Sequence, residues 1–333
     1  MKTAVVILNW NGKNLLEKFL PSVVSHSKKA NIYVADNAST DDSVDFLKEN
    51  FPEITILQNN ENGGYAKGYN DALSHLEEEI LILLNSDVEV TSNWLAPIVD
   101  CFEKQPNTAA VQPKILDYKN KEYFEYAGAA GGFIDQLGYP FCRGRIFDTV
   151  EKDEGQYNDE IEIFWASGAC LAIRKKVFEE VGKLDEAYFA HQEEIDLCWR
   201  IRNFGYQIKY TPKSTVYHVG GATLKNTDAR KTYYNFRNSL FNLVKNFAEK
   251  KWWVFVAIRL VLDGVAGIHF LIQLKPKHTW AIVSAHFSFW RNLRKMLKKR
   301  KGLPKKKIKL PIFSVVYHYY VQDKKTYAEL FRV

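Results

Sequence analysis

Hydrophobic and polar positions follow a regular alternation through the first third of the chain. Four short apolar runs have the length and composition of buried strands, at residues 4–8, 32–35, 54–57 and 80–84. Between them, residues 15–25, 43–49 and 65–76 place apolar side chains at helical spacing. Strands that alternate with helices predict a mostly parallel sheet flanked by helices, which is an α/β fold.

The pattern changes after this first part. Ser92 is expected to cap a helix whose apolar side chains begin at Trp94. Residues 117–162 are polar, aromatic and rich in glycine, and they predict a long insertion near the active face of the sheet. Regular structure is expected again from Phe164 to about Tyr210, and a helical pattern begins after Asp228.

Each of the four predicted strands ends on a cluster of polar residues. The clusters are Asn9-Trp10-Asn11-Gly12, Asp36-Asn37-Ala38-Ser39-Thr40-Asp41, Asn60-Glu61-Asn62-Gly63-Gly64-Tyr65 and Asn85-Ser86-Asp87. The carboxyl ends of parallel strands form the edge at which α/β folds bind ligands. Turn propensity alone explains any one cluster, but four in succession favour a nucleotide diphosphate along this edge.

The chemistry of these clusters suits a nucleotide. Asp36 can accept hydrogen bonds from a base or a ribose. The pair Gly63-Gly64 allows the backbone close to a ligand beside a helix N-terminus, which favours anions. Asp87 follows five consecutive Ile or Leu residues and offers a carboxylate to a hard cation, Mg²⁺ or Mn²⁺.

Several other classes of protein are disfavoured. The turn after the first strand has one glycine, so the G-x-G-x-x-G fingerprint of dinucleotide-binding oxidoreductases is missing, as is a Walker A loop. The four cysteines lie far apart without a metal-ligand pattern and are expected to be buried thiols in a reducing compartment. The start of the chain lacks the architecture of a signal peptide, which favours a cytoplasmic protein.

Charge is concentrated near the end of the chain. Residues 291–309 contain eleven Lys or Arg and no acid, against a net charge of +7 for all 333 residues. The preceding segment, 252–274, is apolar but contains Arg259 and Asp263. We therefore expect a helix that lies in the membrane interface, with the basic block attracted to anionic lipid, rather than a spanning helix. A buried helix with a solvated basic tail is the alternative. No nucleic-acid partner is expected, because no binding motif accompanies the block.

The strand-end blocks together resemble family 2 glycosyltransferases. The blocks that carry this resemblance are Val5–Gly12, Val34–Asp41, Asn62–Ala66 and Leu83–Asp87. The branch they resemble most builds bacterial surface polysaccharides and is rhamnosyltransferase-like. The resemblance extends from Lys2 to about Gly221. It implies a GT-A fold over residues 1–225, with a nucleotide-binding half at about 1–116 and an acceptor-side half at about 117–225, followed by a helical C-terminal region at 226–333.

The resemblance also implies the residues of a site. The nucleotide-binding residues would be Leu8, Asn9, Asn11, Asp36, Asn37, Asn62, Gly63, Gly64, Lys67, Asn85 and Ser86. Asp87 would hold the metal with His218, although Asn85 stands where the family's D-x-D motif has its first aspartate. The pocket for donor and acceptor sugars would contain Trp165, Ser167 and Gly168. Trp165 could equally be a core residue.

An acidic helix start supplies the expected base. Glu193-Glu194-Ile195-Asp196-Leu197-Cys198-Trp199-Arg200 resembles the family's E-D-x-D-L-C-x-R signature. The general base would be Glu194, with Glu193 or Asp196 as substitutes. Complementation of the helix dipole is a simpler explanation for acids at this position.

The function that follows is inverting sugar transfer. The expected donor is a UDP- or dTDP-sugar, with dTDP-rhamnose as one candidate, and the acceptor is a hydroxyl of a glycan or lipid-linked glycan at the inner face of the cell membrane. A sugar nucleotidyltransferase would need a phosphate-gripping loop after the first strand, which residues 9–14 do not offer. A non-catalytic binding protein of the same fold remains the other alternative.

Overall fold

The computed structural model describes residues 1–220 and 228–331 of the chain. Gly221 and the expected domain boundary at 225/226 therefore lie outside the described residues. The first half contains β1 (Thr3–Asn9), α1 (Lys13–His26), β2 (Asn31–Asp36), α2 (Ser43–Asn50), β3 (Thr55–Gln58), α3 (Gly64–Leu73) and β4 (Ile80–Asn85). All four predicted strands and the three helices between them are confirmed.

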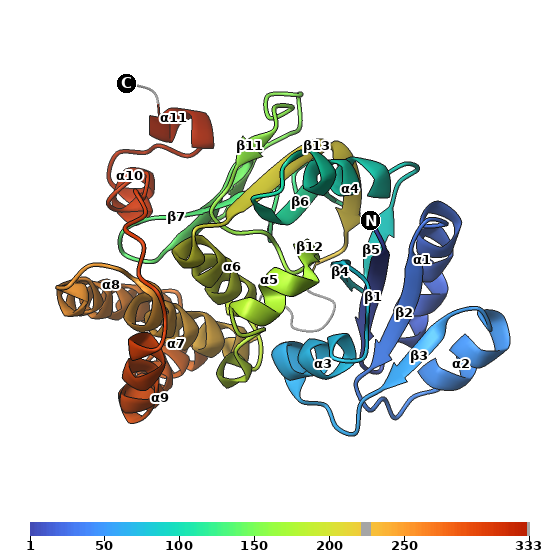
Figure 1. The fold of residues 1–333 in the computed structure, drawn as a ribbon. Helices are drawn as coiled ribbons and strands as arrows, with labels where there is room; N and C mark the ends of the chain where they lie inside the picture. The colour runs from blue at the N-terminus through green and yellow to red at the C-terminus, as the bar shows by residue number, and fades with distance from the viewer. Residues whose placement is uncertain (221–227, 332–333) are drawn as a thin grey trace.

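These four strands form the parallel part of the central sheet. β1 lies between β2 and β4, and β3 pairs with β2 at the edge (Figure 1). The five apolar residues of β4 are completely buried, as expected for a strand covered on both faces. Parallel pairing brings the polar ends of β1, β2, β3 and β4 to one edge of the sheet.

The sheet continues beyond β4 with mixed strand directions. Its other strands are β5 (Val88–Val90), β6 (Thr108–Asp117), β11 (Ile161–Glu162), β12 (Cys170–Arg174) and β13 (Gln207–His218). The order along the sheet is β11-β13-β6-β12-β4-β1-β2-β3, and β5 pairs with β13. β12 runs antiparallel between β4 and β6, whereas β13 is parallel to β6.

Ser92 does not cap a helix, so that prediction is wrong. α4 (Leu95–Lys104) begins after Trp94, because Ser92 and Asn93 belong to a turn closed by a hydrogen bond from Trp94 N to Thr91 O (3.3 Å). Asn93 has a φ of 60° in this turn, a conformation that asparagine tolerates better than most residues.

The segment 117–162 is more ordered than its sequence suggested. It forms a second sheet of β7 (Gly132–Ile134), β8 (Pro140–Cys142), β9 (Arg145–Ile146) and β10 (Thr149–Val150), and its last strand, β11, joins the main sheet. After it, residues 163–169 connect to β12 without regular structure, so the next strand begins later than Phe164. α5 (Lys175–Glu180), a 3₁₀ turn (Glu186–Tyr188) and α6 (Glu193–Phe204) follow.

The C-terminal part is helical and shares the core of the rest of the chain. Its helices are α7 (Ala229–Asn246), α8 (Trp252–Ile272), α9 (Pro276–Lys301), α10 (Val315–Tyr320) and α11 (Tyr327–Phe331). They lie on the side of the molecule opposite to α1 and α2 (Figure 1). Leu240, Leu243 and Phe289 belong to the same hydrophobic cluster as Leu83 of β4. Cys101, Cys142, Cys170 and Cys198 are all buried and free, as expected.

Candidate active site

The ends of β1, β2 and β3 meet at the carboxylate of Asp36. Asn9 Nδ2 donates to Asp36 Oδ1 (3.2 Å), while Ser39 N (3.0 Å) and Gln58 Nε2 (3.2 Å) donate to Oδ2. Asp36 has no exposed surface. In this conformation Asp36 therefore orders the strand ends, and a nucleoside could contact its carboxylate only after these donors move.

Asn11 holds the loop that follows β2. Its Oδ1 accepts a hydrogen bond from Thr40 N (2.7 Å), and its own N–H donates to Ser39 Oγ (2.9 Å). Next to it, Trp10 is 49% exposed and presents an aromatic surface at this edge of the sheet. Trp10 belongs to the first strand-end cluster but was not predicted to be a site residue, because its indole offers no ligand for a metal or a phosphate.

The end of β2 is joined to the start of α3 by a chain of amides. Asn37 Nδ2 donates to Asn62 Oδ1 (2.9 Å), and Asn62 Oδ1 also accepts from Gly64 N (3.1 Å). Gly64 has a φ of +80°, and a Cβ at this position would lie 2.5 Å from the carbonyl oxygen of Phe189. Gly64 is thus required both for its backbone conformation and for close contact with the loop before α6.

The remaining nucleotide-site candidates are placed around this chain of amides. Lys67 is on the first turns of α3, where Asp71 (2.6 Å) and Glu61 (3.7 Å) bind its ammonium group. A Cβ on Gly63 would lie 2.5 Å from the side chain of Lys67. Leu8 packs near Gly68 of the same helix, below the polar ends of the strands.

A cluster of polar side chains occupies the ends of β4 and β13. His218 Nε2 lies 3.1 Å from Asp87 Oδ1, and His218 Nδ1 lies 3.3 Å from Glu125 Oε1. Asn85 Nδ2 is 3.4 Å from His218 Nε2. Burial alone would lower the pKa of His218, but the carboxylates of Glu125 and Asp87 outweigh burial and raise it to about 10. The structure therefore brings Asn85, Asp87 and His218 together, as expected.

The separation of Asp87 and His218 can be compared with the spacing of two ligands on one divalent cation. Two ligands at about 2.1 Å from one cation, in adjacent coordination positions, lie about 3 Å apart, and the separation of Asp87 Oδ1 and His218 Nε2 is close to that value. Glu125 lies beside the other imidazole nitrogen, where a carboxylate can orient a metal-ligating histidine, but Nδ1 makes no aligned hydrogen bond to it in this conformation. In the part of the chain that the structure describes, no group of three or more His, Cys, Asp or Glu side chains is arranged to hold a metal ion by itself. The residues fit a cation that takes its other ligands from a diphosphate and water.

Glu125 was not expected to contribute to this site. It lies in the 117–162 segment and is far from Asp87 and His218 in the sequence. Its side chain is buried, and its Oε1 would contact a Cβ on Gly220 at 2.9 Å. No pattern around Glu125 indicates this contact, which arises because the insertion folds back across the end of β13.

The three acids at the start of α6 have different surroundings. Burial raises the pKa of Glu194 to about 7, against opposing hydrogen bonds from backbone N–H groups at the helix start. Glu193 is buried more completely, and burial together with the charge of Glu194 raises its pKa well above the ordinary value. A carboxylate with a pKa near 7 is suited to accept a proton at neutral pH.

Asp196 is unsuited to be a substitute base, contrary to the expectation from the sequence. Arg200 Nη2 and Lys245 Nζ each lie 2.8 Å from its Oδ2, and Asn246 Nδ2 donates to its Oδ1 (2.8 Å). Burial alone would raise the pKa of Asp196, but Arg200 and Lys245 outweigh burial and lower it. Asp196 therefore anchors α6 to α7, and its proton affinity is too low for a base.

Tyr65 connects the acidic helix start to the end of β4. Its hydroxyl donates to Gly168 O (2.9 Å), and the neighbouring Ala169 O accepts from Asn85 N (3.0 Å). Burial, the nearby Tyr69 and the charges of Glu193 and Glu194 raise the pKa of Tyr65. Tyr65, which feels the charges of the α6 acids, is thus linked to the polar end of β4 through the 168–169 segment.

The three pocket candidates are all part of this buried segment or adjacent to it. Trp165 is 3% exposed, and its indole N–H donates to Phe133 O (2.8 Å). Its ring packs directly on Gly132, so this geometry favours the core alternative over stacking on a sugar. Ser167 accepts from Ala169 N and is buried, while Gly168 leaves room for the hydroxyl of Tyr65. Ser86 lies across from Gly12 at the end of β4.

The fold and the arrangement of polar strand ends are those of a GT-A glycosyltransferase. The family model for glycosyl transferase family 2 matches residues 4–182. This match covers more than half of the chain, and the chain therefore belongs to glycosyl transferase family 2.

Comparison with individual proteins agrees with this assignment. The chain is 27% identical over 230 residues to an N-acetylglucosaminyl-diphospho-decaprenol L-rhamnosyltransferase of Mycobacterium tuberculosis, covering 64% of this chain and 75% of that protein. GalNAc-T7 with UDP, GalNAc and Mn²⁺ superposes with a TM-score of 0.62 at 17% identity, covering 89% of this chain and 57% of that one. The mannosyltransferase PcManGT of Pyrobaculum calidifontis, in complex with GDP-Man and Mn²⁺, gives a TM-score of 0.55 at 15% identity and covers 87% of each chain. At such identities the two structures indicate the fold alone.

Proposed function

We propose that this glycosyltransferase moves a sugar, with inversion at the anomeric carbon, from a UDP- or dTDP-sugar to a hydroxyl group of a lipid-linked glycan. The observation that supports the proposal is a chain of contacts between two features. Tyr65, close to Glu194 with its pKa of about 7, bonds to Gly168, and the adjacent Ala169 bonds to Asn85 at the end of β4, beside Asp87 and His218.

Glu194 is the proposed general base. Its carboxylate would accept the proton of the acceptor hydroxyl as that oxygen attacks the anomeric carbon, and the bond to the nucleoside diphosphate would break in the same step. The neighbouring acids Glu193 and Asp196 have different surroundings. Glu193 is buried with a strongly raised pKa, and Asp196 fixes the position of the helix through Lys245 and Arg200.

Asp87 and His218 are the residues that would hold a divalent cation, Mg²⁺ or Mn²⁺, with Glu125 orienting the imidazole. Such a cation supplies Lewis-acid stabilisation of the negative charge that develops on the leaving diphosphate. Asn85 replaces an aspartate here, so this chain brings one carboxylate fewer to the cation and relies more on His218. The amide chain from Asn37 to Gly64 is the proposed neighbour of the nucleotide.

The acceptor is proposed from two observations. The Mycobacterium tuberculosis relative is named for an acceptor joined to decaprenol through a diphosphate, and the present chain ends in an aromatic and basic helical region. A lipid-linked acceptor of this kind would be met at the inner face of the cell membrane. A sugar nucleotidyltransferase is no longer a serious rival, because the chain belongs to a glycosyltransferase family.

The proposal is tested by incubating the protein with UDP- and dTDP-sugars and Mn²⁺ and measuring released nucleoside diphosphate. Slow hydrolysis of one donor, accelerated by a lipid-diphosphate glycan, is the expected result. A protein that consumes no donor, and whose melting temperature no nucleoside diphosphate raises, would instead be a non-catalytic member of the family. Glu194→Gln should bind the nucleotide normally and lose transfer.

A further inference from the structure

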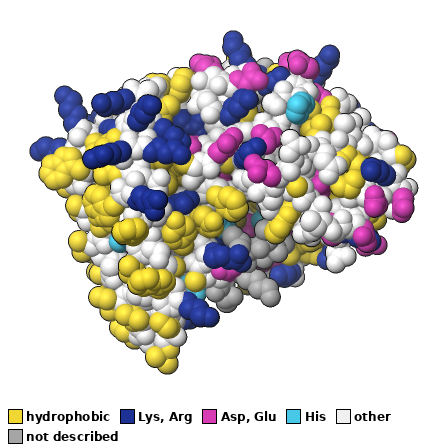
Figure 2. All heavy atoms as spheres, turned by 90° about the horizontal axis from the view of Figure 1, so that it is seen from below, with side chains coloured by type: hydrophobic (Ala, Val, Ile, Leu, Met, Phe, Trp, Pro, Cys, Tyr) yellow, Lys and Arg dark blue, Asp and Glu magenta, His cyan; other side chains and the backbone are white. Residues whose placement is uncertain are grey.

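The outer face of α8 and α9 is an extended apolar surface. In α8 it consists of Trp253, Val261, Val265, Ile268 and Ile272, and in α9 of Trp280, Val283, Phe287 and Trp290. Trp280 and Phe287 are 70% and 72% exposed. Figure 2 shows apolar side chains gathered over this part of the molecule, with Lys and Arg side chains beside them. Single exposed apolar residues are ordinary, but a contiguous group of this kind marks an interaction surface.

One stripe of α9 changes from apolar to basic halfway along the helix. The exposed positions 280, 283, 287 and 290 recur every three or four residues, which places them on one side of the helix. The same spacing continues through Arg294, Lys298 and Lys301, all of them exposed. α9 contains no Asp or Glu. The apolar and the basic surfaces are therefore two halves of one continuous face.

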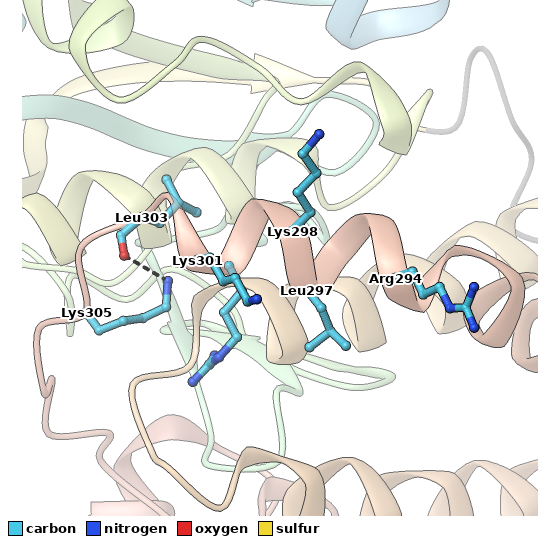
Figure 3. Close-up of a pocket in the computed structure, with 7 residues that line it drawn as sticks. Arg294, Leu297, Lys298, Lys301, Leu303 and Lys305 are labelled. Atoms are coloured by element: carbon cyan, nitrogen blue, oxygen red, sulfur yellow. Dashed lines mark hydrogen bonds between the residues drawn. The ribbon is translucent and has the colours of Figure 1, made fainter.

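The basic half of this face contains a hollow. A cavity of about 600 Å³ is lined by Arg294, Leu297, Lys298, Arg300, Lys301, Leu303 and Lys305 (Figure 3). Burial and the nearby Arg300 lower the pKa of Lys305 to about 8. Among the described residues, no carboxylate forms an ion pair with Arg294, Lys298 or Lys301. Within the described residues, these three cations of the hollow therefore carry positive charge without an ion-pair partner.

The inner face of α8 explains why this apolar helix contains two charged residues. Arg259 Nε donates to Asp263 Oδ1 (2.7 Å), and Arg259 Nη2 donates to Ser239 Oγ of α7 (2.9 Å). The guanidinium group also lies 3.6 Å from the ring centre of Tyr139. Arg259 and Asp263 are buried. They bind the middle of α8 to the body of the protein.

This attachment bears on the orientation of α8. Among the described residues it is the helix whose length and composition would suffice to cross a bilayer, with a mean hydropathy of 1.9. Crossing would require the buried Arg259–Asp263 pair to leave its protein partners and enter hydrocarbon, which is costly. A helix attached to the protein on one side and apolar on the other is suited to lie along the membrane surface.

We propose that the outer face of α8 and α9, together with the basic hollow, docks the protein on an anionic lipid bilayer. The apolar half enters the boundary between headgroups and acyl chains, and Arg294, Lys298 and Lys301 contact lipid phosphates. A second copy of this chain is a poorer occupant, because it would bring a second set of these cations into the same interface. The proposal is independent of the transfer reaction.

Flotation of the intact protein with lipid vesicles tests the proposal. We expect binding to phosphatidylcholine vesicles that contain phosphatidylglycerol, weaker binding to phosphatidylcholine alone, and a loss of affinity as ionic strength rises. The triple variant Arg294→Gln/Lys298→Gln/Lys301→Gln should bind anionic vesicles about 100-fold less tightly, since each cation near such a surface contributes roughly a factor of five. Trp280→Ser/Phe287→Ser/Trp290→Ser should lose binding to both kinds of vesicle.

The matched control is Lys28→Gln/Lys29→Gln/Lys48→Gln, which removes three exposed lysines from the opposite end of the molecule. It should bind vesicles as the unmodified protein does, and all variants should keep the same melting temperature. The proposal is overturned if the unmodified protein stays unbound on anionic vesicles. It is equally overturned if the α9 variants bind like the control, or if the aromatic variant only converts a dimer into a monomer. Donor hydrolysis without vesicles should be unchanged in every variant, which separates failure here from failure of the proposed function.

Discussion

The ammonium group of Lys245 lies 2.8 Å from Asp196 Oδ2 and 2.6 Å from Asp185 Oδ2; Lys245 and Asp196 are buried, and the side chain of Asp185 is 8% exposed. Lys245 belongs to α7 of the C-terminal region, whereas Asp196 lies two residues after Glu194 in α6. Lys299 of α9 also donates to Asp185. Lys245 of α7 thus holds the helix that carries the proposed base, and Lys299 of α9 holds Asp185 in the segment that precedes this helix.

Lys245→Met should reduce both stability and turnover. Removing one partner of a buried ion pair leaves charge without compensation, so we expect a loss of about 3 kcal/mol in the free energy of unfolding. The start of α6 would lose part of its support, and kcat should fall while the KM for the donor changes little. Denaturant unfolding and steady-state kinetics measure the two effects. Lys250→Met, at an exposed position of the same region, is the control, and equal behaviour of the two variants would contradict the anchoring role.

Glu194→Gln should stabilise the protein while abolishing transfer. The folded state holds the pKa of Glu194 at about 7, above its ordinary value of 4.5. Ionisation of this carboxyl therefore lowers the free energy of the unfolded chain more than that of the folded protein. As a result, the free energy of unfolding falls progressively as pH rises from about 4.5 to 7. Glutamine removes this penalty, so at pH 8 the variant should be more stable by about 1–3 kcal/mol. At pH 4 the difference should vanish. Glu17→Gln, at an exposed site, should have no effect at either pH.

The pH dependence of transfer follows from the same group. A general base acts in its ionised form, so kcat/KM should rise about tenfold per pH unit below pH 7 and level off above it. Glu194→Asp, with a shorter and differently placed carboxylate, should shift or flatten the rise of kcat/KM below pH 7. A profile that is flat between pH 5 and pH 8 in the unmodified enzyme would show that another group accepts the proton.

Two acids around His218 should differ in their effects on metal-dependent binding. Asp87→Asn removes a proposed ligand and should abolish the enhancement of UDP binding by Mn²⁺. Glu125→Gln keeps both ligands but weakens the group that orients the imidazole, so the affinity for Mn²⁺ should fall about 10- to 100-fold. Calorimetric titration of UDP with and without Mn²⁺ measures both. Glu122→Gln changes an exposed acid nearby and should leave the affinity unaltered.

Gly64→Ala should strain the nucleotide edge. The new Cβ would lie 2.5 Å from Phe189 O at a φ of +80°, and we expect a cost of about 1–3 kcal/mol together with weaker donor binding. Gly264→Ala is a matched control, because a Cβ there meets nothing within 4 Å, and alanine should stabilise that helix by about 0.5–1 kcal/mol. Thermal unfolding of both variants should move in opposite directions.

Local patterns in the sequence were sufficient to predict the strands of the parallel half of the sheet. Ile80–Leu84 and its sister strands are short apolar runs bounded by turn residues, and each could be recognised by itself. The five strands of the 117–162 segment, β7 to β11, contain two or three residues each, too few for an alternating pattern to be visible. Ser92 was assigned as a cap from its identity, whereas a neighbouring turn decided where α4 begins.

The candidate site was predictable where it follows strand ends and hidden where it depends on distant contacts. Asn85, Asp87 and His218 were expected together and are together. Glu125 reaches His218, and Lys245 reaches Asp196, only because segments distant in sequence pack against each other. Asp196 illustrates the limit well, since its residue type suits a base and only its partners exclude that role. Trp165 likewise needed the position of Gly132 before its surroundings were known.

The rigid attachment of α9 has a geometric consequence for the acceptor. Lys299 fixes one side of this helix to Asp185, close to the helix of the proposed base, while the opposite side is the proposed contact with lipid. The height of the catalytic carboxylate above the bilayer is then set by packed side chains and cannot vary freely. Such an enzyme would favour an acceptor hydroxyl at one particular number of sugar units from the lipid anchor.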